Sequence, residues 1–289
     1  MTHWQTTRYR IDLSQPRVMG IVNVTPDSFA DGGRYADTAS ALRHCERLLR
    51  DGAHILDIGG ESTRPGSPPL ALTEELARVL PVVRQAVKFG VPISVDTYKP
   101  EVMTAALDLG ADIINDIWAL RHPGHNGGPS ALEVIARQPA CGVCLMHMHG
   151  NPQTMQRSPM EGDAVPLVLL FLQQVTQALR AHGVDKSRIV VDPGIGFGKT
   201  VAQNFALLAR QAQLLTAGYP LLAGWSRKSS IGAALQDDGK AAVSPHERVA
   251  GSVAAALLAV ERGASVVRVH DVRETVQALA VWRHMRAAA

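Results

Sequence analysis

Ile55-Leu-Asp-Ile-Gly-Gly-Glu-Ser-Thr-Arg-Pro-Gly66 is the stretch that decides the fold of this chain. It begins as an apolar run that is long enough for one buried strand and too short for a helix. It then breaks at Gly59-Gly60, where the backbone can turn sharply and approach a ligand closely. A buried strand that ends in a polar loop is how α/β proteins build ligand sites at the carboxyl ends of parallel strands. For this stretch alone, a tight turn with a solvated polar tip is the alternative.

The same design recurs along the chain. A loosely alternating segment at residues 3–13 predicts a short N-terminal β-hairpin that plugs one end of the fold. Eight predicted strands follow, at residues 17–23, 54–58, 92–95, 112–117, 142–146, 188–191, 220–223 and 266–269. Helices are predicted between and after them, at residues 37–50, 73–89, 100–109, 130–137, 165–182, 202–211, 229–235, 246–262 and 272–285, with Asp37 or Thr38 as the first cap.

Strands that alternate with helices, without an internal linker, predict a single domain over residues 1–289 with a closed parallel sheet, a (β/α)8 TIM barrel. A doubly wound open sheet is the rival architecture. It would carry a glycine-rich dinucleotide loop after its first strand, and Asn23-Val-Thr-Pro-Asp-Ser-Phe29 is not such a loop.

Composition limits the partners and the compartment. Hydrophobic residues make up 46% of the 289 residues, which supports a large core, and the net charge is only +3. Without a long basic run, a nucleic-acid partner is not indicated. Residues 1–10 lack the apolar core of a signal peptide, and the longest apolar runs, such as residues 253–260, are too short to span a membrane. Three cysteines, an odd number, favour a reducing cytoplasm.

Polar side chains stand at the ends of the predicted strands. In a barrel, the inward side chains at the carboxyl ends of the strands meet in one bowl. Burying such a ring is costly unless it binds something polar, so the ring predicts a ligand site. Its members are Asn23, Glu61-Ser-Thr-Arg64, Asp96-Thr97, Asn115-Asp116, His147, Asp192, Arg268 and His270, and the seventh strand leads into Gly224-Trp-Ser-Arg-Lys-Ser229.

Two chemistries are mixed in this ring. Hydrogen-bond acceptors suit a flat heterocycle with N–H donors, and these are Asp96, Asp192, Asn115 and Asn23. Groups that are or can be cationic suit a phosphate or pyrophosphate, and these are Lys228, Arg64, Arg268 and His270. A solvated helix start is the alternative for Arg227 and Lys228.

Two short motifs invite metal interpretations. Cys141 and Cys144 have CxxC spacing, but an offset of three places the two sulfurs on opposite faces of a strand, which favours buried, inert cysteines. His147 and His149 would share one face of a strand, as in barrel metallohydrolases. Those enzymes need further histidines at other strand ends, and only His270 is placed to help.

Residues 19–33 (Met-Gly-Ile-Val-Asn-Val-Thr-Pro-Asp-Ser-Phe-Ala-Asp-Gly-Gly) and residues 57–66 resemble the two signature segments of dihydropteroate synthases. The resemblance continues in order, from about residue 12 to residue 285, through Ser94-Val-Asp-Thr97, Ile114-Asn-Asp116, Leu145-Met-His-Met-His-Gly-Asn-Pro152, Asp192-Pro-Gly-Ile-Gly-Phe-Gly-Lys199, Ser226-Arg-Lys-Ser229 and Arg268-Val-His-Asp271. It implies a (β/α)8 barrel that joins 6-hydroxymethyl-7,8-dihydropterin pyrophosphate to p-aminobenzoate in folate biosynthesis. It also implies a need for Mg2+, inhibition by sulfonamides, and a homodimer.

The resemblance also assigns roles to residues. It implies that the pterin and its pyrophosphate are bound by Thr63, Arg64, Asp96, Asn115, Met146, Asp192, Phe197, Lys228, Arg268 and His270. Among these, the groups expected to assist the chemistry are Asp96, Asp192, Lys228 and Arg268. The p-aminobenzoate and sulfonamide pocket is expected to comprise Phe29, Pro65, Lys228 and Ser229, and Asn23 resembles the Mg2+ ligand.

The chain departs from the family pattern at Trp118, at the enlarged loop 121–129 and at Trp225, and these departures bear on the shape of the rim and the fit of inhibitors. Two other functions stay open at this point. One is a pterin-binding methyltransferase barrel, which has no use for a pyrophosphate clamp. The other is a catalytically silent paralogue that binds pterin without turnover.

Overall fold

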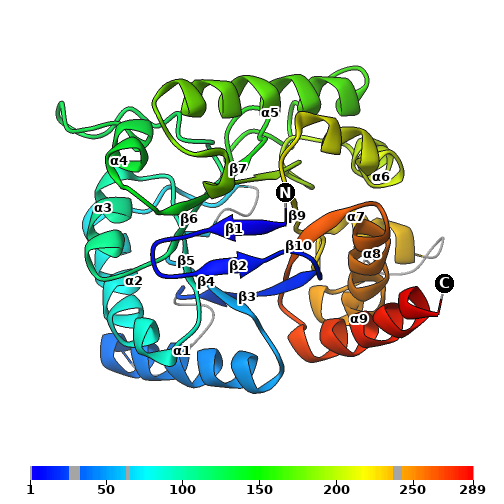
Figure 1. The fold of residues 1–289 in the computed structure, drawn as a ribbon, viewed down its shortest axis with the longest axis horizontal. Coiled ribbons are helices and arrows are strands. Elements are labelled where there is room, and N and C mark those ends of the chain that lie inside the picture. The colour runs from blue at the N-terminus through cyan, green and yellow to red at the C-terminus, as the bar shows by residue number, and fades with distance from the viewer. Residues whose placement is uncertain (1, 26–32, 63–65, 237–242, 289) are drawn as a thin grey trace.

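Eight parallel strands close into a barrel in the order β10-β3-β4-β5-β6-β7-β8-β9 (Figure 1). The computed structural model describes residues 2–25, 33–62, 66–236 and 243–288. The barrel strands are β3 (Arg17–Asn23), β4 (Ile55–Gly59), β5 (Ile93–Asp96), β6 (Ile113–Asp116), β7 (Gly142–Met146), β8 (Ile189–Asp192), β9 (Leu221–Ala223) and β10 (Ala264–Val269). The predicted TIM barrel is confirmed, and every predicted strand is present with bounds that differ by at most two residues.

Helices surround the barrel (Figure 1). They are α1 (Gly33–Arg50), α2 (Leu72–Ala86), α3 (Pro100–Asp108), α4 (Ala131–Arg137), α5 (Ala164–Ala181), α6 (Val201–Ala209), α7 (Ser229–Leu235), α8 (Val249–Glu261) and α9 (Val272–Ala287). Short 3-10 helices are η2 (Val87–Phe89), η3 (Lys186–Arg188), η4 (Gln211–Ala217) and η5 (Pro245–Arg248). The prediction that Asp37 or Thr38 caps the first helix is wrong, because α1 already begins at Gly33 and no helix breaker separates the two positions.

Helix α5 corrects the expectation about apolar runs. By length and composition alone, Ala164–Ala181 is long and apolar enough to cross a membrane. In the structure α5 is one of the helices around the barrel (Figure 1). It packs against β7, α6 and η4, and the Asp163 carboxylate caps its first turn by accepting from the Val165 amide. Its apolar face therefore belongs to the core between barrel and helices.

Side chains alternate between the inside of the barrel and the surrounding helices. The lower interior is a separate apolar cluster that comprises Met19, Ile55, Ile113, Cys144, Val190, Leu222 and Val266 together with Trp4, Ile11 and Leu13. The last three come from β1 (His3–Gln5), β2 (Arg10–Asp12) and the residue that follows β2, and Trp4 Nε1 donates to the Arg188 carbonyl at 2.9 Å. The predicted hairpin therefore plugs the end of the barrel at which the strands begin (Figure 1).

Candidate active site

The next layer of side chains inside the barrel, toward the carboxyl ends of the strands, is largely polar. Five strands contribute the side chains that form the floor of the predicted bowl. In each of these strands, the side chain lies two residues after the apolar residue that faces the barrel interior. Because successive inward positions on a strand are two residues apart, these side chains share one level of the barrel. They are Asp57, Asn115, Met146, Asp192 and Arg268.

Arg268 links two carboxylates in this layer. Its Nε donates to Asp57 Oδ2 at 2.5 Å, and its Nη2 donates to Asp96 Oδ2 at 2.6 Å. Burial alone would lower the pKa of Arg268, but Asp57 and Asp96 outweigh burial and hold it above its ordinary value. Burial raises the pKa of Asp96 to about 7, although the Arg268 charge opposes this shift. Arg268 is therefore a permanent cation at the centre of the bowl.

Asp57 is a site residue that sequence reasoning missed. It is fully buried, and its Oδ2 also accepts from Asn115 Nδ2 at 3.2 Å. The sequence predicted a buried strand around Asp57 and gave its side chain no role. Counting in steps of two from Ile55 would have placed it inside the barrel, level with Asn115.

Asp192 and Lys228 face the same space as Arg268. Asp192 Oδ1 accepts from the Gly194 amide at 2.7 Å, and Lys228 Nζ lies 4.3 Å from the centre of the Phe197 ring. Burial raises the pKa of Asp192, while the Gly194 amide and then Lys228 act against this shift. Burial and the neighbouring Arg268 lower the pKa of Lys228 to about 8. The pair therefore offers a ligand one hydrogen-bond acceptor, the Asp192 carboxylate, and one ammonium group, Lys228, whose pKa of about 8 lies not far above neutral pH.

An apolar wall completes the bowl. Met146 and Phe197 belong to a buried cluster with Ile117, Met148 and Met155, and Tyr98 and Trp118 pack against it. Trp118 stacks on Tyr98 with ring centroids 5.6 Å apart, so it joins the rim as expected. Thioethers beside aromatic rings suit the faces of a flat heterocycle.

Trp225 does not lie on the rim, so that expectation is wrong. The side chain is 1% exposed and packs in the core between barrel and helices, with its ring 5.4 Å from that of Phe205. The alternation of inward and outward side chains continues past the end of β9. Gly224 is the inward position, and Trp225 consequently points outward.

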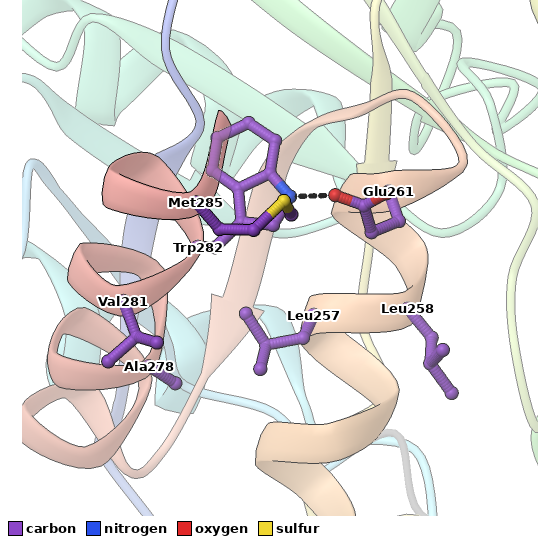
Figure 2. A pocket seen from close by; sticks show the side chains of 7 residues that line it. All are labelled: Leu257, Leu258, Glu261, Ala278, Val281, Trp282 and Met285. Atoms are coloured by element: carbon purple, nitrogen blue, oxygen red, sulfur yellow. Dashed lines mark hydrogen bonds between the residues drawn. The ribbon is translucent and has the colours of Figure 1, made fainter. Parts of the chain in front are cut away.

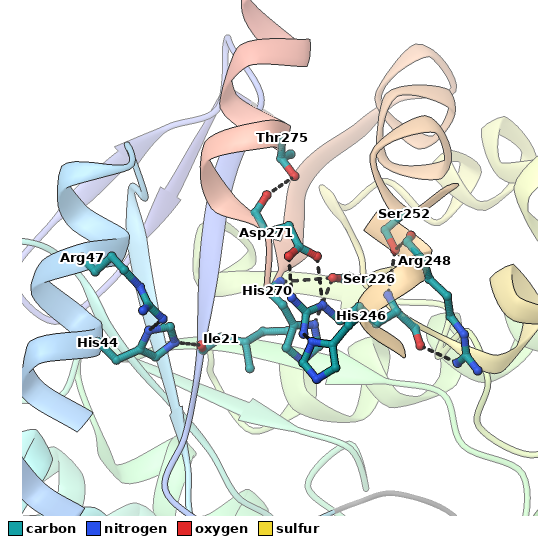
Figure 3. Close-up of polar contacts among 11 residues, drawn as sticks. Ile21, His44, Arg47, Ser226, His246, Arg248, Ser252, His270, Asp271 and Thr275 are labelled. Carbon is teal, nitrogen blue, oxygen red and sulfur yellow. Dashed lines mark hydrogen bonds and ion pairs between the residues drawn. The ribbon is translucent and has the colours of Figure 1, made fainter. Parts of the chain in front are cut away.

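The loop that begins at Ser226 is held by internal contacts (Figure 3). Arg227 has a φ of 59°, and its Nε and Nη2 donate to the two oxygens of Asp271 at 3.0 and 2.5 Å. Its amide donates to Ser252 Oγ at 2.9 Å, and Arg248 Nη1 donates to its carbonyl at 3.0 Å. The solvated helix start is therefore wrong for Arg227. These contacts hold the loop so that Lys228 faces the bowl.

His270 is neutral in this structure. Its Nδ1 lies 2.9 Å from Ser226 Oγ, and its amide donates to the same hydroxyl at 3.1 Å (Figure 3). Burial, followed by the charges of Arg268 and Arg227, lowers the pKa of His270 to about 3. Without an anionic ligand, His270 therefore carries no positive charge. The imidazole is left to act by hydrogen bonding.

The metal interpretations lose their geometric basis. β7 ends at Met146, so His147 and His149 share no strand face. His147 Nδ1 instead accepts from Lys199 Nζ at 2.9 Å, and its ring packs edge-on against Phe171. Cys141 lies in the outer core and Cys144 in the barrel interior, which confirms that the sulfurs face opposite sides.

A buried ion network lies beside the bowl and was also missed. Lys99 Nζ donates to Glu75 Oε2 at 2.5 Å and to the Glu61 carboxylate. Thr97 Oγ1 donates to Glu75 Oε1 at 2.6 Å, and Tyr98 OH donates to Glu61 Oε1 at 3.1 Å. The network holds Glu61, at which the polar loop after β4 begins. No local pattern shows it, because its members come from three separate segments.

The other predicted residues are placed as follows. Asn23 ends β3 opposite Gly59, which is itself opposite Asp96, so Asn23 lies at the mouth. Ser229 is the first residue of α7 and is exposed beside Lys228. Four predicted residues lie outside the described ones, and they are Phe29, Thr63, Arg64 and Pro65.

Known proteins resemble this chain over nearly its whole length. The family of pterin binding enzymes matches residues 19–270. A dihydropteroate synthase of Neisseria meningitidis serogroup B is 50% identical over 284 residues, with 96% of each chain covered. The crystal structure of Burkholderia cenocepacia dihydropteroate synthase complexed with 7,8-dihydropteroate is 51% identical, covers 99% of this chain and 97% of its own, and has a TM-score of 0.87. Yersinia pestis dihydropteroate synthase in a sulfonamide drug complex is 45% identical, with 99% of each chain covered and a TM-score of 0.89.

Proposed function

The chain belongs to the dihydropteroate synthase family of pterin-binding enzymes, and we propose that its bowl of polar strand ends is where the family's reaction takes place. The reaction joins 6-hydroxymethyl-7,8-dihydropterin pyrophosphate to p-aminobenzoate and releases pyrophosphate, a transferase step of folate biosynthesis. The observation that carries the proposal is the meeting of acceptors and cations in one bowl at the carboxyl ends of the strands, at Asp192, Asn115, Asp96, Arg268 and Lys228.

Recognition of the pterin is assigned to the floor and the wall. The Asp192 carboxylate accepts from the amino group and the adjacent ring N–H, a two-point match that fixes the ring in its plane. Asn115, Lys228 and Asp96 contact the remaining heteroatoms. Met146 and Phe197 pack near the ring, and the Arg268 guanidinium stacks against it.

The pyrophosphate is assigned to the side of Arg268 that faces the mouth of the bowl. His270 acts there as a neutral hydrogen-bond donor, and Thr63 or Arg64 supplies further donors. The p-aminobenzoate and sulfonamide pocket is assigned to Phe29, Pro65, Lys228 and Ser229, beside the methylene end of the pterin.

The chemistry is a displacement at the pterin methylene carbon. The amine nitrogen of p-aminobenzoate forms the new C–N bond, the C–O bond to pyrophosphate breaks with its electrons, and the amine proton goes to solvent. Positive charge that spreads onto the dihydropterin in a loose transition state is stabilised by Asp96 and Asp192, and Arg268 stabilises the leaving group. A neutral aromatic amine is already nucleophilic, so no residue is assigned as a general base.

The donor set at the mouth fits Mg2+ only as a partly protein-bound ion. Asn23 offers one neutral oxygen, and the described residues contain no group of three or more His, Cys, Asp or Glu side chains that could hold a metal. Asn23 would hold the ion while pyrophosphate and water supply the other oxygens. When bound, Mg2+ neutralises charge on the departing pyrophosphate.

This donor set predicts metal binding that depends on pyrophosphate. Calorimetric titration of the protein with Mg2+ alone is expected to give weak binding, and titration in the presence of pyrophosphate much tighter binding, because the phosphate oxygens supply most of the ligands. Asn23→Ala is expected to weaken only the second titration. Equally tight binding in both titrations would contradict the assignment.

Lys228 predicts a pH dependence of pterin binding. Its pKa is about 8, so the ammonium is present below this pH and is lost as the pH rises through it. Affinity for a pterin that carries no phosphate is expected to fall above pH 8, by up to about tenfold for each further pH unit. In Lys228→Arg, the cation persists and this decline is expected to disappear. An unchanged decline in the arginine variant would assign the titration to another group.

We propose further that the chain is a single domain that works as a cytoplasmic homodimer. Its three cysteines are buried and free, which suits a reducing compartment. Between α8 and α9 lies an apolar groove lined by Leu257, Leu258, Glu261, Ala278, Val281, Trp282 and Met285, with Glu261 accepting from Trp282 Nε1 (Figure 2). Val281 is 72% exposed, and two adjacent helices with such a surface suit a second copy of the same face.

Val281→Arg is expected to convert the dimer into a monomer, because two copies of the new charge would meet across a twofold interface. Sedimentation velocity measures the change. Leu170→Arg, on the exposed side of α5, is the matched control and is expected to stay dimeric. A dimeric Val281→Arg variant would remove the α8–α9 groove from the interface.

A further inference from the structure

Asp57 holds two of the groups to which the proposed function assigns substrate contacts. It lies inside the barrel on β4 with no solvent exposure. Its Oδ2 accepts from Arg268 Nε at 2.5 Å and from Asn115 Nδ2 at 3.2 Å. Its Oδ1 is buried and has no hydrogen-bond partner among the described residues. The charge of Asp57 is therefore offset mainly by Arg268.

The two ends of the Arg268 guanidinium are held differently. Nε is bound to a carboxylate that water cannot reach, whereas Nη2 is bound to Asp96, whose side chain is 14% exposed at the mouth. Withdrawing Nε would leave a buried, unpaired charge, which is among the costliest changes in a protein interior. Withdrawing Nη2 would leave a carboxylate that water or a ligand can solvate. The Nη2 contact is thus the one that can be exchanged.

The same carboxylate fixes the Asn115 amide. Beside the Arg268 cation, Asp57 is a carboxylate, which can only accept hydrogen bonds. The Asn115 nitrogen must therefore face Asp57. The Asn115 oxygen is then the atom left for a ligand, and it accepts from a ring N–H.

We infer that Asp57 is a positioning residue that tethers Arg268 through Nε during turnover, while Nη2 leaves Asp96 for the pyrophosphate, and that also presents the Asn115 oxygen to the pterin. This inference deepens the proposed function and rests on it. Release of Asp96 by Nη2 frees carboxylate lone pairs for the incoming pterin. Asp57 itself touches neither substrate.

The test is steady-state kinetics on the full chain with Asp57→Asn, which keeps the shape of the side chain and removes its charge. The asparagine has one neutral amide oxygen as its acceptor, in place of the charged carboxylate that accepts from Arg268 and Asn115. We expect the KM for the pterin pyrophosphate to rise at least about tenfold, with a lower kcat. The KM for p-aminobenzoate is expected to change less than about twofold. Equal rises in both KM values would show a general disturbance and overturn the inference.

Ser94→Ala is the matched control. Ser94 is the register partner of Asp57 on β5, is also fully buried, and its Oγ has no partner within the described structure. It is expected to leave both KM values unchanged. If Ser94→Ala raises the pterin KM as much as Asp57→Asn does, the effect belongs to the packing of this layer and the inference fails.

A second measurement does not depend on the folding of a variant. In a crystal structure of the wild-type chain with pyrophosphate and Mg2+, Arg268 Nε is expected to stay within hydrogen-bond distance of Asp57, and Nη2 to contact pyrophosphate in place of Asp96. A guanidinium that has left Asp57 would overturn the tether. A wild-type chain that releases no pyrophosphate during assay would instead contradict the proposed function. Unaltered kinetics of Asp57→Asn beside an active wild type would contradict the tether alone.

Discussion

Asp192→Asn is expected to weaken binding of a pterin analogue at least about tenfold. The carboxylate is buried at the end of β8, where its Oδ1 accepts from the Gly194 amide at 2.7 Å. In the proposed complex, it also accepts from two pterin donors. An asparagine must turn its amino group toward either Gly194 or the pterin, so a donor meets a donor. The loss of one hydrogen bond to a charged group costs about 1.5–3 kcal/mol, which corresponds to tenfold or more.

Isothermal calorimetry on the folded variant measures this loss. Asp185→Asn provides a matched control, because Asp185 caps η3 just before the opposite end of the same strand and its side chain is 67% exposed. The control is expected to bind the analogue like the wild type. Undiminished affinity in Asp192→Asn would remove this residue from the site.

Lys99→Met is expected to lower the free energy of unfolding by about 3–5 kcal/mol, the range observed when one partner of a buried ion pair is removed. Lys99 is buried between Glu61 and Glu75, and the substitution leaves both carboxylates in the interior without their cation. The methionine fills most of the space of the lysine stem. The expected loss is therefore electrostatic and not the result of a cavity.

Denaturant unfolding of the purified chain tests this expectation. Lys88→Met is the control, because Lys88 is exposed on η2, where its Nζ donates to Gln85 Oε1 at 2.8 Å. Its expected change lies within about 0.5 kcal/mol. Adding Glu75→Gln to Lys99→Met is expected to restore part of the loss, since it removes one of the stranded charges. Equal unfolding midpoints for the Lys99 and Lys88 variants would show that the network adds nothing to stability.

The sequence predicted the barrel because its signals are local. Each strand is a short apolar run, and the period of two inside a barrel assigns side chains to one face without knowledge of their neighbours. This rule placed Asn115, Asp192 and Arg268 in the bowl. The same rule places Asp57 inside the barrel, but the apolar residues around it predicted only a buried strand.

Other features depend on contacts between distant segments. The neutral state of His270 follows from its burial beside Arg268 and Arg227, and the Lys99 network joins residues 61, 75 and 99. The residue at which β7 ends decides whether His147 and His149 share a face, and strand ends are set by tertiary packing. No reading of local pattern could supply these facts.

Pyrophosphate release by the purified chain, measured with and without p-aminobenzoate, tests the central claim most directly. With dihydropterin pyrophosphate, Mg2+ and p-aminobenzoate present, we expect one pyrophosphate for each 7,8-dihydropteroate formed, and little release when p-aminobenzoate is omitted. A silent paralogue would bind the pterin and release nothing in either assay. That result, or release that does not respond to p-aminobenzoate, would contradict the assignment of the reaction to this bowl.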